Sequence, residues 1–495
     1  MSDRLHFGTA GLRAALGEGP LRMNDQVVSQ AATAIGRWLP PGSVVVIGAD
    51  ARHGSEEFAN VTARILAEAG HEPRLFDQPV PTPVVAWAVG DSDAAAGVMV
   101  TASHNPATDN GYKVYSADGG QILPPDAEAI EAIIETLEWP ESVDTARPPG
   151  LTMLGDDEID GYVAAIERPT PVGSLTIVYT AMHGVGGALI ERVLGSAGHE
   201  VHPVPEQQQP DPDFPTAAFP NPEEPGTLDL AMALAADVDA EMILANDPDA
   251  DRLAVAVPRD GTWERLTGDQ IGVLLGWFLL GQTEGERAVV TTIVSSSMLG
   301  KVAAAAGAKI HTVLTGFKWL ARSGDDEPDV PLIFGYEEAL GYSVNLSIRD
   351  KDGISAALVF CEMVAQLREH GHTVDDVLDN LYAIHGVHVT SQVSQRFDGD
   401  DAMDRMSAAM TRVRSDPPTE VGGLRVLHID DLIHGGRLPP SDVLIYALEG
   451  GRLIIRPSGT EPKVKAYVEA VAGDRSEADL RRAQLEDAAR HLLAG

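Results

Sequence analysis

Strand-like and helix-like patterns alternate in a repeating order through most of the chain. Three runs rich in β-branched and aliphatic residues each precede a helix-like segment that ends on Ala-Gly; the runs are Val44–Gly48, Leu175–Tyr179 and Ala288–Val294. The glycines of those pairs, Gly70, Gly198 and Gly307, stand where the end of a helix needs a left-handed residue. The same order, found three times, predicts an internal repeat.

Further strand-like runs complete each repeat. A short run follows each glycine directly, and a later one ends the repeat; the later runs are Ala96–Val100, Glu241–Ala245 and Val330–Phe334. This order is typical of a mostly parallel sheet with helices on both faces. We therefore predict three similar α/β domains with mixed sheets, over residues 1–150, 151–265 and 266–385.

The last part of the chain follows a different pattern. Its strand-like runs are Val387–Val393, Asp442–Tyr446, Arg452–Ile455 and Val464–Glu469, and its helix-like segments are Ala402–Val413 and Ser476–Leu493. Strands that do not alternate regularly with helices predict a smaller α+β domain over residues 386–495.

The composition is that of a globular protein with an acidic surface. Hydrophobic residues make up 44% of the 495 residues and charged residues 22%, which excludes a disordered or collagen-like chain. The 36 Lys and Arg residues against 74 Asp and Glu give a formal net charge of −38. Such a surface repels phosphate backbones and anionic lipid, so we expect no nucleic-acid partner and no membrane partner. The pattern specifies no oligomeric state.

Cysteine usage and hydropathy point to a soluble, cytoplasmic protein. The single cysteine, Cys361, excludes a disulfide framework and a Cys-rich zinc module, and its helical spacing among apolar neighbours predicts a core position. The first residues contain no apolar signal-peptide region. The longest uncharged apolar stretch, Ile271–Gly281, is shorter than the roughly 20 residues that a membrane span requires.

A loop rich in reactive side chains follows the last strand of each predicted repeat. These loops are Thr101–Pro106, Asn246–Arg252 and Gly335–Tyr342. Ligands of open α/β sheets bind beyond the carboxyl ends of the strands. Three equivalent loops therefore predict one composite active site at the domain junction.

Asp247, Asp249 and Asp251 alternate directly after a predicted strand. Alternate carboxylates can direct hard oxygen ligands at one divalent cation. An EF-hand calcium loop is excluded because Arg252 stands where the sixth position needs Gly, and Pro258 where the twelfth needs Glu. A metal site, a phosphatase nucleophile and a solvated acidic turn stay open as interpretations.

Ser103 leaves a strand end beside His104, which is a potential base. A Ser-His-Asp hydrolase is disfavoured because adjacent side chains rarely face each other and no Gly-x-Ser-x-Gly turn surrounds the serine. A serine that caps a proline turn is the alternative. Lys113 follows a tight turn, where its amine suits acid/base chemistry or contact with a phosphate.

Arg456–Pro462 separates two strand-like runs near the C-terminus. Arg456 supplies a forked donor, hydroxyls come from Ser458 and Thr460, and Gly459 lets backbone N–H groups approach an anion. The segment is neither a Walker loop nor a Gly-x-Gly-x-x-Gly dinucleotide loop. It predicts a phosphate-binding loop, with an ordinary turn as the alternative.

Together these segments resemble the α-D-phosphohexomutase superfamily, which contains the phosphoglucomutase and phosphomannomutase enzymes. The resemblance covers nearly the whole chain in the family's order, through Phe7–Arg13, Thr101–Tyr115, Asp247–Arg252, Gly335–Tyr342, Lys351–Gly353 and Arg456–Pro462. The segment Thr101–Tyr115 is most similar to the branch that includes phosphopentomutases. The resemblance implies small-molecule sugar phosphates as partners, with Mg²⁺ and a sugar 1,6-bisphosphate (glucose 1,6-bisphosphate as activator and intermediate) as cofactors.

The resemblance also implies a role for each matching residue. Ser103 would carry the phosphoryl group and bind Mg²⁺ together with Asp247, Asp249 and Asp251. Arg252 would stabilise the transferring phosphoryl group, and Lys113 would be the general acid/base, with His104 as the second choice. Arg13 and Arg52 would line the same site. The substrate would be held by Gly316, Lys318, Glu337 and Lys351 and, at its non-reacting phosphate, by Arg456, Ser458, Gly459 and Thr460.

One position departs from the family pattern. Many members carry Glu-x-Ser in the sugar loop, whereas this chain has Glu337-Glu338-Ala339, which removes a hydrogen bond worth about 0.5–1.5 kcal/mol. The leading interpretation is a mutase that interconverts hexose 1-phosphate and hexose 6-phosphate, with glucose or mannose as the sugar. The alternatives are a phosphopentomutase that acts by the same mechanism, a metal-dependent sugar phosphatase and a non-catalytic relative that only binds sugar phosphates.

Overall fold

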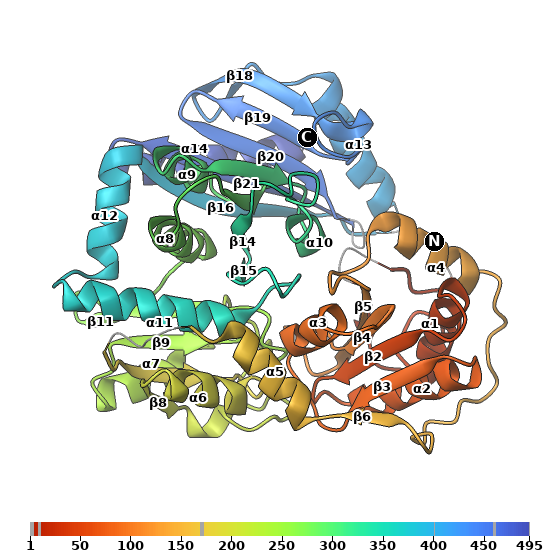
Figure 1. Ribbon diagram of the computed structural model, residues 1–495. Helices are drawn as coiled ribbons and strands as arrows, with labels where there is room; N and C mark the ends of the chain where they lie inside the picture. The colour runs from red at the N-terminus through yellow and green to blue at the C-terminus, as the bar shows by residue number, and fades with distance from the viewer. Residues whose placement is uncertain (1–3, 8–10, 169–172, 400, 459–461, 495) are drawn as a thin grey trace. The chain divides into compact units, whose positions relative to one another are not determined.

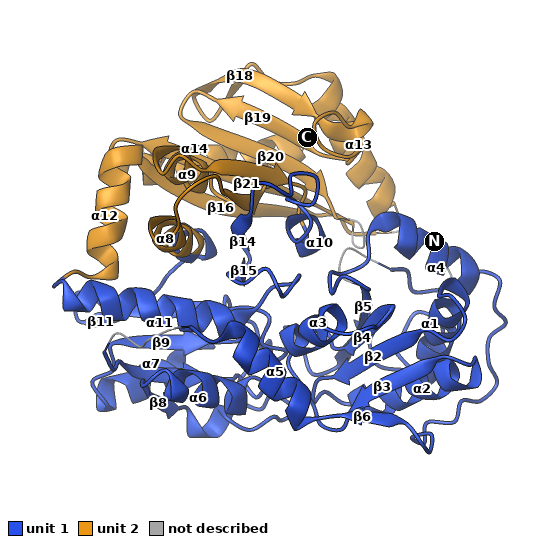
Figure 2. Cartoon of the chain, viewed as in Figure 1, with its two compact units in different colours: residues 1–271, 316–371 blue, residues 272–315, 372–495 orange. Residues whose placement is uncertain are grey.

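The computed structural model describes residues 4–7, 11–168, 173–399, 401–458 and 462–494. The chain forms two compact units, residues 1–271 with 316–371 and residues 272–315 with 372–495 (Figure 2). Residues 266–385, predicted as the third α/β domain, are therefore divided between the two units.

The first unit opens with a mixed sheet (Figure 1). Its elements are β1 (Leu12–Ala15), α1 (Asp25–Trp38), β2 (Val44–Ala49), α2 (Ser55–Glu68), β3 (Glu72–Phe76), α3 (Thr82–Gly90), β4 (Ala96–Val100), β5 (Asp109–Ser116), α4 (Pro124–Ile134) and β6 (Thr152–Leu154). The strand order is β1-β5-β4-β2-β3-β6, with β5 antiparallel to both β1 and β4. Apolar side chains of α1 and α2, among them Ile35 and Leu66, share a buried cluster with Ile47 and Val98 of the sheet.

A second sheet of the same unit repeats this arrangement. Its elements are α5 (Asp156–Ile166), β7 (Thr176–Thr180), α6 (Gly187–Ser196), β8 (Glu200–Pro203), η1 (Pro205–Gln207), α7 (Asp229–Asp237), β9 (Met242–Ala245), β10 (Ala254–Arg259) and β11 (Thr262–Arg265). The strand order is β11-β10-β9-β7-β8. Here β9 occupies the place that β4 holds in the first sheet, so the loops after β4 and β9 are equivalent.

The rest of the first unit comes from the third α/β segment. It consists of α10 (Phe317–Leu320), β14 (Leu332–Glu337), β15 (Gly341–Ser343) and α11 (Gly353–Glu369). β14 pairs antiparallel with β15. The side chain of Asp352 caps α11 by accepting hydrogen bonds from the backbone N–H groups of Ile354 and Ser355.

The second unit contains the C-terminal sheet. After α8 (Gly268–Gly281), which begins in the first unit, come β12 (Ala288–Thr292), α9 (Met298–Ala305), β13 (Lys309–Val313), α12 (Val374–His385), β16 (Val387–Arg396), α13 (Ala402–Ser415), β17 (Glu420–Val421), β18 (Leu424–Asp431), η2 (Leu432–His434), β19 (Leu444–Leu448), β20 (Gly451–Pro457), β21 (Lys463–Ala472) and α14 (Arg475–Ala494). β12 and β13 are parallel. The C-terminal sheet has the order β16-β21-β20-β19-β18-β17, and its neighbouring strands are antiparallel.

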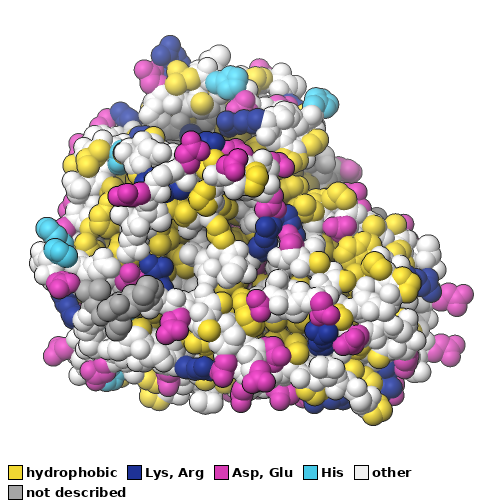
Figure 3. Space-filling model, in the orientation of Figure 1, with side chains coloured by type: hydrophobic (Ala, Val, Ile, Leu, Met, Phe, Trp, Pro, Cys, Tyr) yellow, Lys and Arg dark blue, Asp and Glu magenta, His cyan; other side chains and the backbone are white. Residues whose placement is uncertain are grey.

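The predicted fold class is confirmed, because three α/β segments with mixed sheets precede a C-terminal domain built on an antiparallel sheet. Cys361 is buried, as expected. Carboxylates are scattered over the face drawn in Figure 3, in keeping with the net charge of −38. Among the helices that the structure describes, none combines the length and apolar character that crossing a bilayer requires.

Candidate active site

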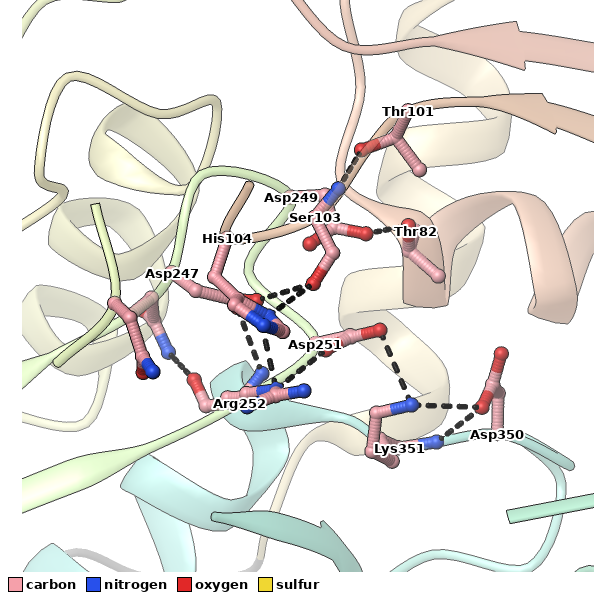
Figure 4. A network of polar contacts seen from close by, with 12 residues as sticks. Thr82, Thr101, Ser103, His104, Asp247, Asp249, Asp251, Arg252, Asp350 and Lys351 are labelled. Atoms are coloured by element: carbon pink, nitrogen blue, oxygen red, sulfur yellow. Dashed lines mark hydrogen bonds and ion pairs between the residues drawn. The ribbon is translucent and has the colours of Figure 1, made fainter. Parts of the chain in front are cut away.

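Ser103 lies in the loop after β4, and its hydroxyl faces the aspartate loop after β9 (Figure 4). Ser103 Oγ donates a hydrogen bond to Asp247 Oδ2 over 2.9 Å and lies 3.2 Å from His104 Nδ1. The residue is only 2% exposed. Its hydroxyl therefore contacts a carboxylate from a distant segment, whereas a serine that merely capped a turn would bond to nearby backbone.

The serine loop has an unusual backbone that Arg52 supports. Ser103 has a φ of +53°, in the left-handed region, where a non-glycine residue costs about 1–3 kcal/mol. The guanidinium of Arg52 donates to the carbonyl oxygens of Ser103, of Asn105 over 2.6 Å and of Pro106 over 2.8 Å. Arg52, which the sequence places in the lining of the site, thus contacts the serine loop through its backbone.

The three aspartates after β9 form a tight cluster. Asp247, Asp249 and Asp251 are at most 1% exposed, and one oxygen of each lies within 4.8 Å of the others. Asn246 closes the loop, because its Nδ2 donates to the carbonyl oxygen of Arg252 over 2.6 Å. Complete burial of all three carboxylates excludes a solvated acidic turn.

The donor set of this cluster fits a divalent cation. Asp249 Oδ1 and Asp251 Oδ1 are buried and have no hydrogen-bond partner among the described residues. A buried carboxylate oxygen without a partner carries a large desolvation cost. Hard divalent cations prefer carboxylate oxygens, so such an ion would satisfy both atoms.

Three cationic side chains surround the aspartates. Lys113 Nζ lies 2.8 Å from both Asp249 Oδ2 and Asp251 Oδ2. Lys351 Nζ is 3.3 Å from Asp251 Oδ2, and Arg252 Nε is 3.8 Å from Asp247 Oδ2 (Figure 4). The cluster thus gathers positive charge inside an acidic protein, as an anionic substrate requires.

The surroundings shift the pKa values of two aspartates in opposite directions. Burial raises the pKa of Asp247, and the charges of Asp249 and Asp251 raise it further. Burial also opposes ionisation of Asp251, but Lys113, Lys351 and Arg252 outweigh it and hold the pKa of that carboxyl far below its usual range. The ionised form is therefore disfavoured at Asp247, the aspartate that contacts Ser103, and favoured at Asp251.

The two candidate acid/base groups differ in protonation. Burial lowers the pKa of His104 well below its usual value, and the positive charges of Arg252 and Arg13 lower it further. Burial opposes the charged form of Lys113, but Asp249 and Asp251 outweigh it and raise its pKa. Near neutral pH, the ring of His104 is thus neutral and able to accept a proton, whereas the amine of Lys113 stays protonated.

The hairpin of β14 and β15 and the segment after it bring further predicted residues to the aspartate loop. Arg252 forms an isolated β-bridge with Gly341. Glu337 and Lys351 approach each other across this glycine, since a Cβ on Gly341 would lie 2.9 Å from Glu337 Cγ and 2.3 Å from Lys351 Cδ. A larger residue at this position would therefore displace the side chain of Glu337 or Lys351. Burial raises the pKa of Glu337, against the charges of Lys351 and Arg252.

The remaining predicted residues of the first unit lie at the edges of this group. Arg13 Nη1 donates to Asn105 Oδ1 in the serine loop over 3.3 Å. Gly316, with a φ of +116°, precedes α10, whose Phe317 ring centre lies 5.6 Å from Lys351 Nζ. The next residue is Lys318, whose pKa is lowered by burial and by the charge of Arg322.

Four models of one protein family match the chain in consecutive order. They describe domains I, II and III of phosphoglucomutase/phosphomannomutase, all alpha/beta/alpha, and its C-terminal domain, and they match residues 4–141, 160–261, 267–384 and 404–487. The chain belongs to the phosphoglucomutase/phosphomannomutase family. It is therefore a phosphosugar mutase, an isomerase that moves a phosphoryl group within a sugar phosphate.

This mutase is similar to relatives that are named for different sugars. It is 42% identical over 484 residues to the "Probable phosphomannomutase" of Haemophilus influenzae, with 95% of this chain and 98% of the relative covered. It is 36% identical over 512 residues to the "Probable phosphoribomutase" of Schizosaccharomyces pombe, with 94% and 87% covered. Among solved structures, a "putative phosphomannomutase" from Thermus thermophilus matches 100% of both chains at a TM-score of 0.78 and 25% identity.

The predicted phosphate loop of the mutase lies in its second unit. Arg456 is half-buried on β20, and the backbone N–H of Ser458 donates to the carbonyl oxygen of Lys463 over 2.8 Å. Gly459 and Thr460 lie outside the described residues. The other predicted site residues belong to the first unit.

Sequence reasoning missed two polar residues that support the mutase's cationic and acidic groups. Thr82 Oγ1, at the start of α3, donates to Asp249 Oδ2 over 2.6 Å. Asp350 accepts hydrogen bonds from Tyr115 Oη and Gln121 Nε2, both over 2.9 Å, and lies 3.8 Å from Lys351 Nζ. The available signals were the Pro-Thr-Pro start of the helix at Thr82 and the position of Asp350 directly before the Lys351–Gly353 segment.

Proposed function

We propose that the enzyme interconverts hexose 1-phosphate and hexose 6-phosphate, with glucose or mannose as the sugar, through phosphorylated Ser103 and a bound sugar 1,6-bisphosphate. The observation that carries the proposal is the 2.9 Å hydrogen bond from Ser103 Oγ to Asp247 Oδ2 within the buried carboxylate cluster. It brings a nucleophilic hydroxyl to a group of residues that can hold a divalent cation.

The cation in this proposal is Mg²⁺, held by Asp247, Asp249, Asp251 and an oxygen of the phosphorylated Ser103. When bound, Mg²⁺ neutralises charge on the phosphoryl oxygens and so favours their transfer. The two buried aspartate oxygens without a described partner support this assignment.

The protein's own residues position and stabilise the transferring group. The bond between phosphorus and Ser103 Oγ breaks, phosphorus bonds to the free hydroxyl oxygen of the sugar monophosphate, and the proton that this hydroxyl loses is balanced by one that Ser103 Oγ gains. The resulting bisphosphate turns, its other phosphoryl group is transferred to Ser103 Oγ, and the proton of the serine is balanced by one that the released sugar oxygen gains. Arg252, close to Asp247 and Asp251, supplies positive charge at the transfer site.

We assign the proton transfer at Ser103 Oγ to His104. Its Nδ1 is 3.2 Å from that oxygen, and its lowered pKa leaves the ring neutral. Lys113, the first choice from the sequence, has its amine bonded to Asp249 and Asp251. We assign Lys113 to charge compensation within the cluster.

The substrate contacts in this proposal follow the sequence assignment. Gly316, Lys318, Glu337 and Lys351 hold the sugar, Arg13 contributes charge beside the serine loop, and Arg456, Ser458, Gly459 and Thr460 hold the distal phosphate. The burial of Glu337 and its approach to Lys351 support the first set.

A phosphopentomutase acting by the same mechanism is the second candidate. Two observations favour it: the similarity to the Schizosaccharomyces pombe protein, and Ala339, which supplies no hydroxyl where many family members have serine. Both candidates use the same serine and metal cluster, so the sugar alone separates them.

The test is a mutase assay with Mg²⁺ and a catalytic trace of glucose 1,6-bisphosphate. Glucose 1-phosphate, mannose 1-phosphate and ribose 1-phosphate are compared for wild type, Ser103→Ala and the exposed control Ser347→Ala. We expect wild type and Ser347→Ala to convert a hexose phosphate, and Ser103→Ala to convert none. Mass spectrometry should locate phosphate on Ser103 in the wild type.

Other outcomes discriminate among the alternatives. Conversion of ribose 1-phosphate alone would identify the enzyme as a phosphopentomutase. Full activity in Ser103→Ala overturns the phosphoserine mechanism, and release of inorganic phosphate that survives this substitution indicates an aspartate-based phosphatase.

A further inference from the structure

A long irregular segment of the first unit contacts the serine loop. Residues 208–228 run from η1 to α7 without a helix or strand, and we call them the Phe219 loop. Irregular segments longer than about 12–15 residues are uncommon in compact domains and tend to form binding loops or active-site lids. None of the predicted site residues lies in this segment.

The Phe219 loop is fixed to the α/β segment from which it comes. Thr216 Oγ1 accepts a hydrogen bond from Gln207 Nε2 over 2.8 Å and lies 2.8 Å from His183 Nε2. Arg265 of β11 donates to the carbonyl oxygen of Pro222 over 2.5 Å. The anchored loop therefore presents its aromatic side chains from a defined position.

Two phenylalanines of the loop reach the residues around Ser103. The Arg52 guanidinium lies 4.8 Å from the ring centre of Phe214, which is 3% exposed. Phe219 meets the His104 ring edge to face, with the ring centres 5.9 Å apart and an interplanar angle of 67°. The loop thus contacts both the residue that supports the serine turn and the residue beside Ser103 Oγ.

Exposure distinguishes the two aromatic residues. Phe219 is 37% exposed although it is large and apolar, whereas Ser103 behind His104 is 2% exposed. The Phe219 ring therefore faces solvent with part of its surface and packs with another part against the ring of His104, the neighbour of Ser103. An apolar ring at this place contributes little to the core, but it keeps water from the part of His104 that it covers.

Limited water access matters for a phosphoserine enzyme. In hydrolysis, a water oxygen bonds to phosphorus and the bond from phosphorus to Ser103 Oγ breaks. One proton of the water passes to the seryl oxygen, and inorganic phosphate leaves with the other. Each such event removes the phosphoryl group that the sugar needs, and exclusion of water suppresses this side reaction.

We propose that Phe219 shields phosphorylated Ser103 from water and so sets the ratio of phosphoryl transfer to sugar over hydrolysis. The inference rests on the proposed function, because it presupposes a phosphoserine at position 103. It assigns Phe219 a positioning and shielding role, with no bond to the reacting atoms.

The experiment follows the decay of the phosphorylated enzyme in the absence of sugar. Full-length wild type, Phe219→Ala, Phe219→Leu and Leu230→Ala are phosphorylated with glucose 1,6-bisphosphate and freed of sugar; the release of inorganic phosphate and the intact mass are then followed over time. Leu230 on α7 is the matched control, since it is also 37% exposed and apolar. Thermal unfolding confirms that each variant is folded.

We expect Phe219→Ala to lose phosphate about tenfold faster than wild type, equivalent to about 1.4 kcal/mol in activation free energy. Phe219→Leu, which keeps an apolar side chain, and Leu230→Ala should decay close to the wild-type rate. Equal decay of Phe219→Ala and wild type would overturn the shielding role and leave the proposed function intact. A wild type that never gains phosphate on Ser103 would overturn the proposed function, and the shielding role with it.

Discussion

Ser103 and Asp247 lie 144 positions apart in the sequence, yet a hydrogen bond of 2.9 Å joins their side chains. The bond links the loop after β4 to the loop after β9, which are equivalent places in two copies of one repeat. The internal repeat therefore does more than build sheets, because it supplies the proposed nucleophile and the proposed metal ligands from matching strand ends.

Asp247→Asn should change stability in opposite directions with and without metal. In EDTA at pH 7 we expect the variant to be more stable than wild type, by about 1 kcal/mol or more, because its raised pKa makes ionised Asp247 unfavourable in the folded protein. Mg²⁺ at about 100 times its Kd should stabilise wild type by about 2.7 kcal/mol and the variant far less.

Urea unfolding with EDTA and with Mg²⁺ measures both effects. Asp229→Asn, an exposed aspartate at the start of α7, is the control and should respond to Mg²⁺ as wild type does. Equal stabilisation of Asp247→Asn by Mg²⁺ would contradict the assignment of Asp247 as a metal ligand.

Lys113→Met should destabilise the folded enzyme strongly. The substitution leaves Asp249 and Asp251 buried without the amine that lies 2.8 Å from each, and the loss of one partner of a buried ion pair costs about 3–5 kcal/mol. Lys301→Met removes an exposed amine and should cost much less. Urea unfolding in EDTA compares the two, and a similar loss in both variants would show that the buried pairs add little.

The fold was largely readable from the sequence because small residues mark its turns. Gly70, Gly198 and Gly307 have φ values of +85°, +85° and +68° and directly follow the C-cap residues of α2, α6 and α9, as the repeat predicts. Alternation of apolar runs with glycine is a local signal, so one sequence suffices to find it. The hairpin of β10 and β11 was missed although its turn, Asp260-Gly261 with φ values of +50° and +79°, is a local signal of the same kind.

The interior of the site was less readable. Ser103, Ala250 and Leu340 all adopt left-handed backbone in the loops after β4, β9 and β14, with φ values of +53°, +54° and +62°. Three different residue types share this conformation, so no residue preference reveals it. The ion pairs of Lys113 and the contact of Phe219 with His104 join loops that are distant in the sequence. Such contacts leave no local pattern in a single sequence.

Glu469 should make the stability of the second unit depend on pH. Burial opposes its charge, but Arg452 outweighs this together with hydrogen bonds from His388 and Ser296, so the pKa of Glu469 lies far below its usual value. A depressed pKa contributes stability above the unfolded pKa of about 4.3, and this contribution is lost as pH falls toward the folded pKa. At pH 7, Glu469→Gln should therefore lower the free energy of unfolding by about 3 kcal/mol.

The difference in the free energy of unfolding between wild type and Glu469→Gln should become smaller as pH falls below about 4. Urea unfolding at a series of pH values measures it, with Glu477→Gln on α14 as an exposed control that should show a small gap throughout. A gap that stays constant between about pH 7 and pH 3 would rule out the ion pair as its source.

Ala339→Ser should alter the choice of sugar without altering the mechanism. The substitution introduces the hydroxyl that many family members carry two residues after the glutamate, and one such hydrogen bond is worth about 0.5–1.5 kcal/mol. We expect kcat/KM for hexose phosphates to rise relative to ribose 1-phosphate by up to about tenfold. Competition assays with mixed substrates check this ratio, and an unchanged ratio would show that position 339 does not contact the sugar.

The left-handed backbone of Ser103 restricts which amino acids can occupy this position. Threonine offers the same hydroxyl oxygen, but a β-branched side chain is strongly disfavoured at a φ of +53°. The exchange of this serine for threonine is therefore disfavoured, although the two residues offer the same reactive group. The backbone conformation thus favours serine over threonine as the proposed phosphate carrier.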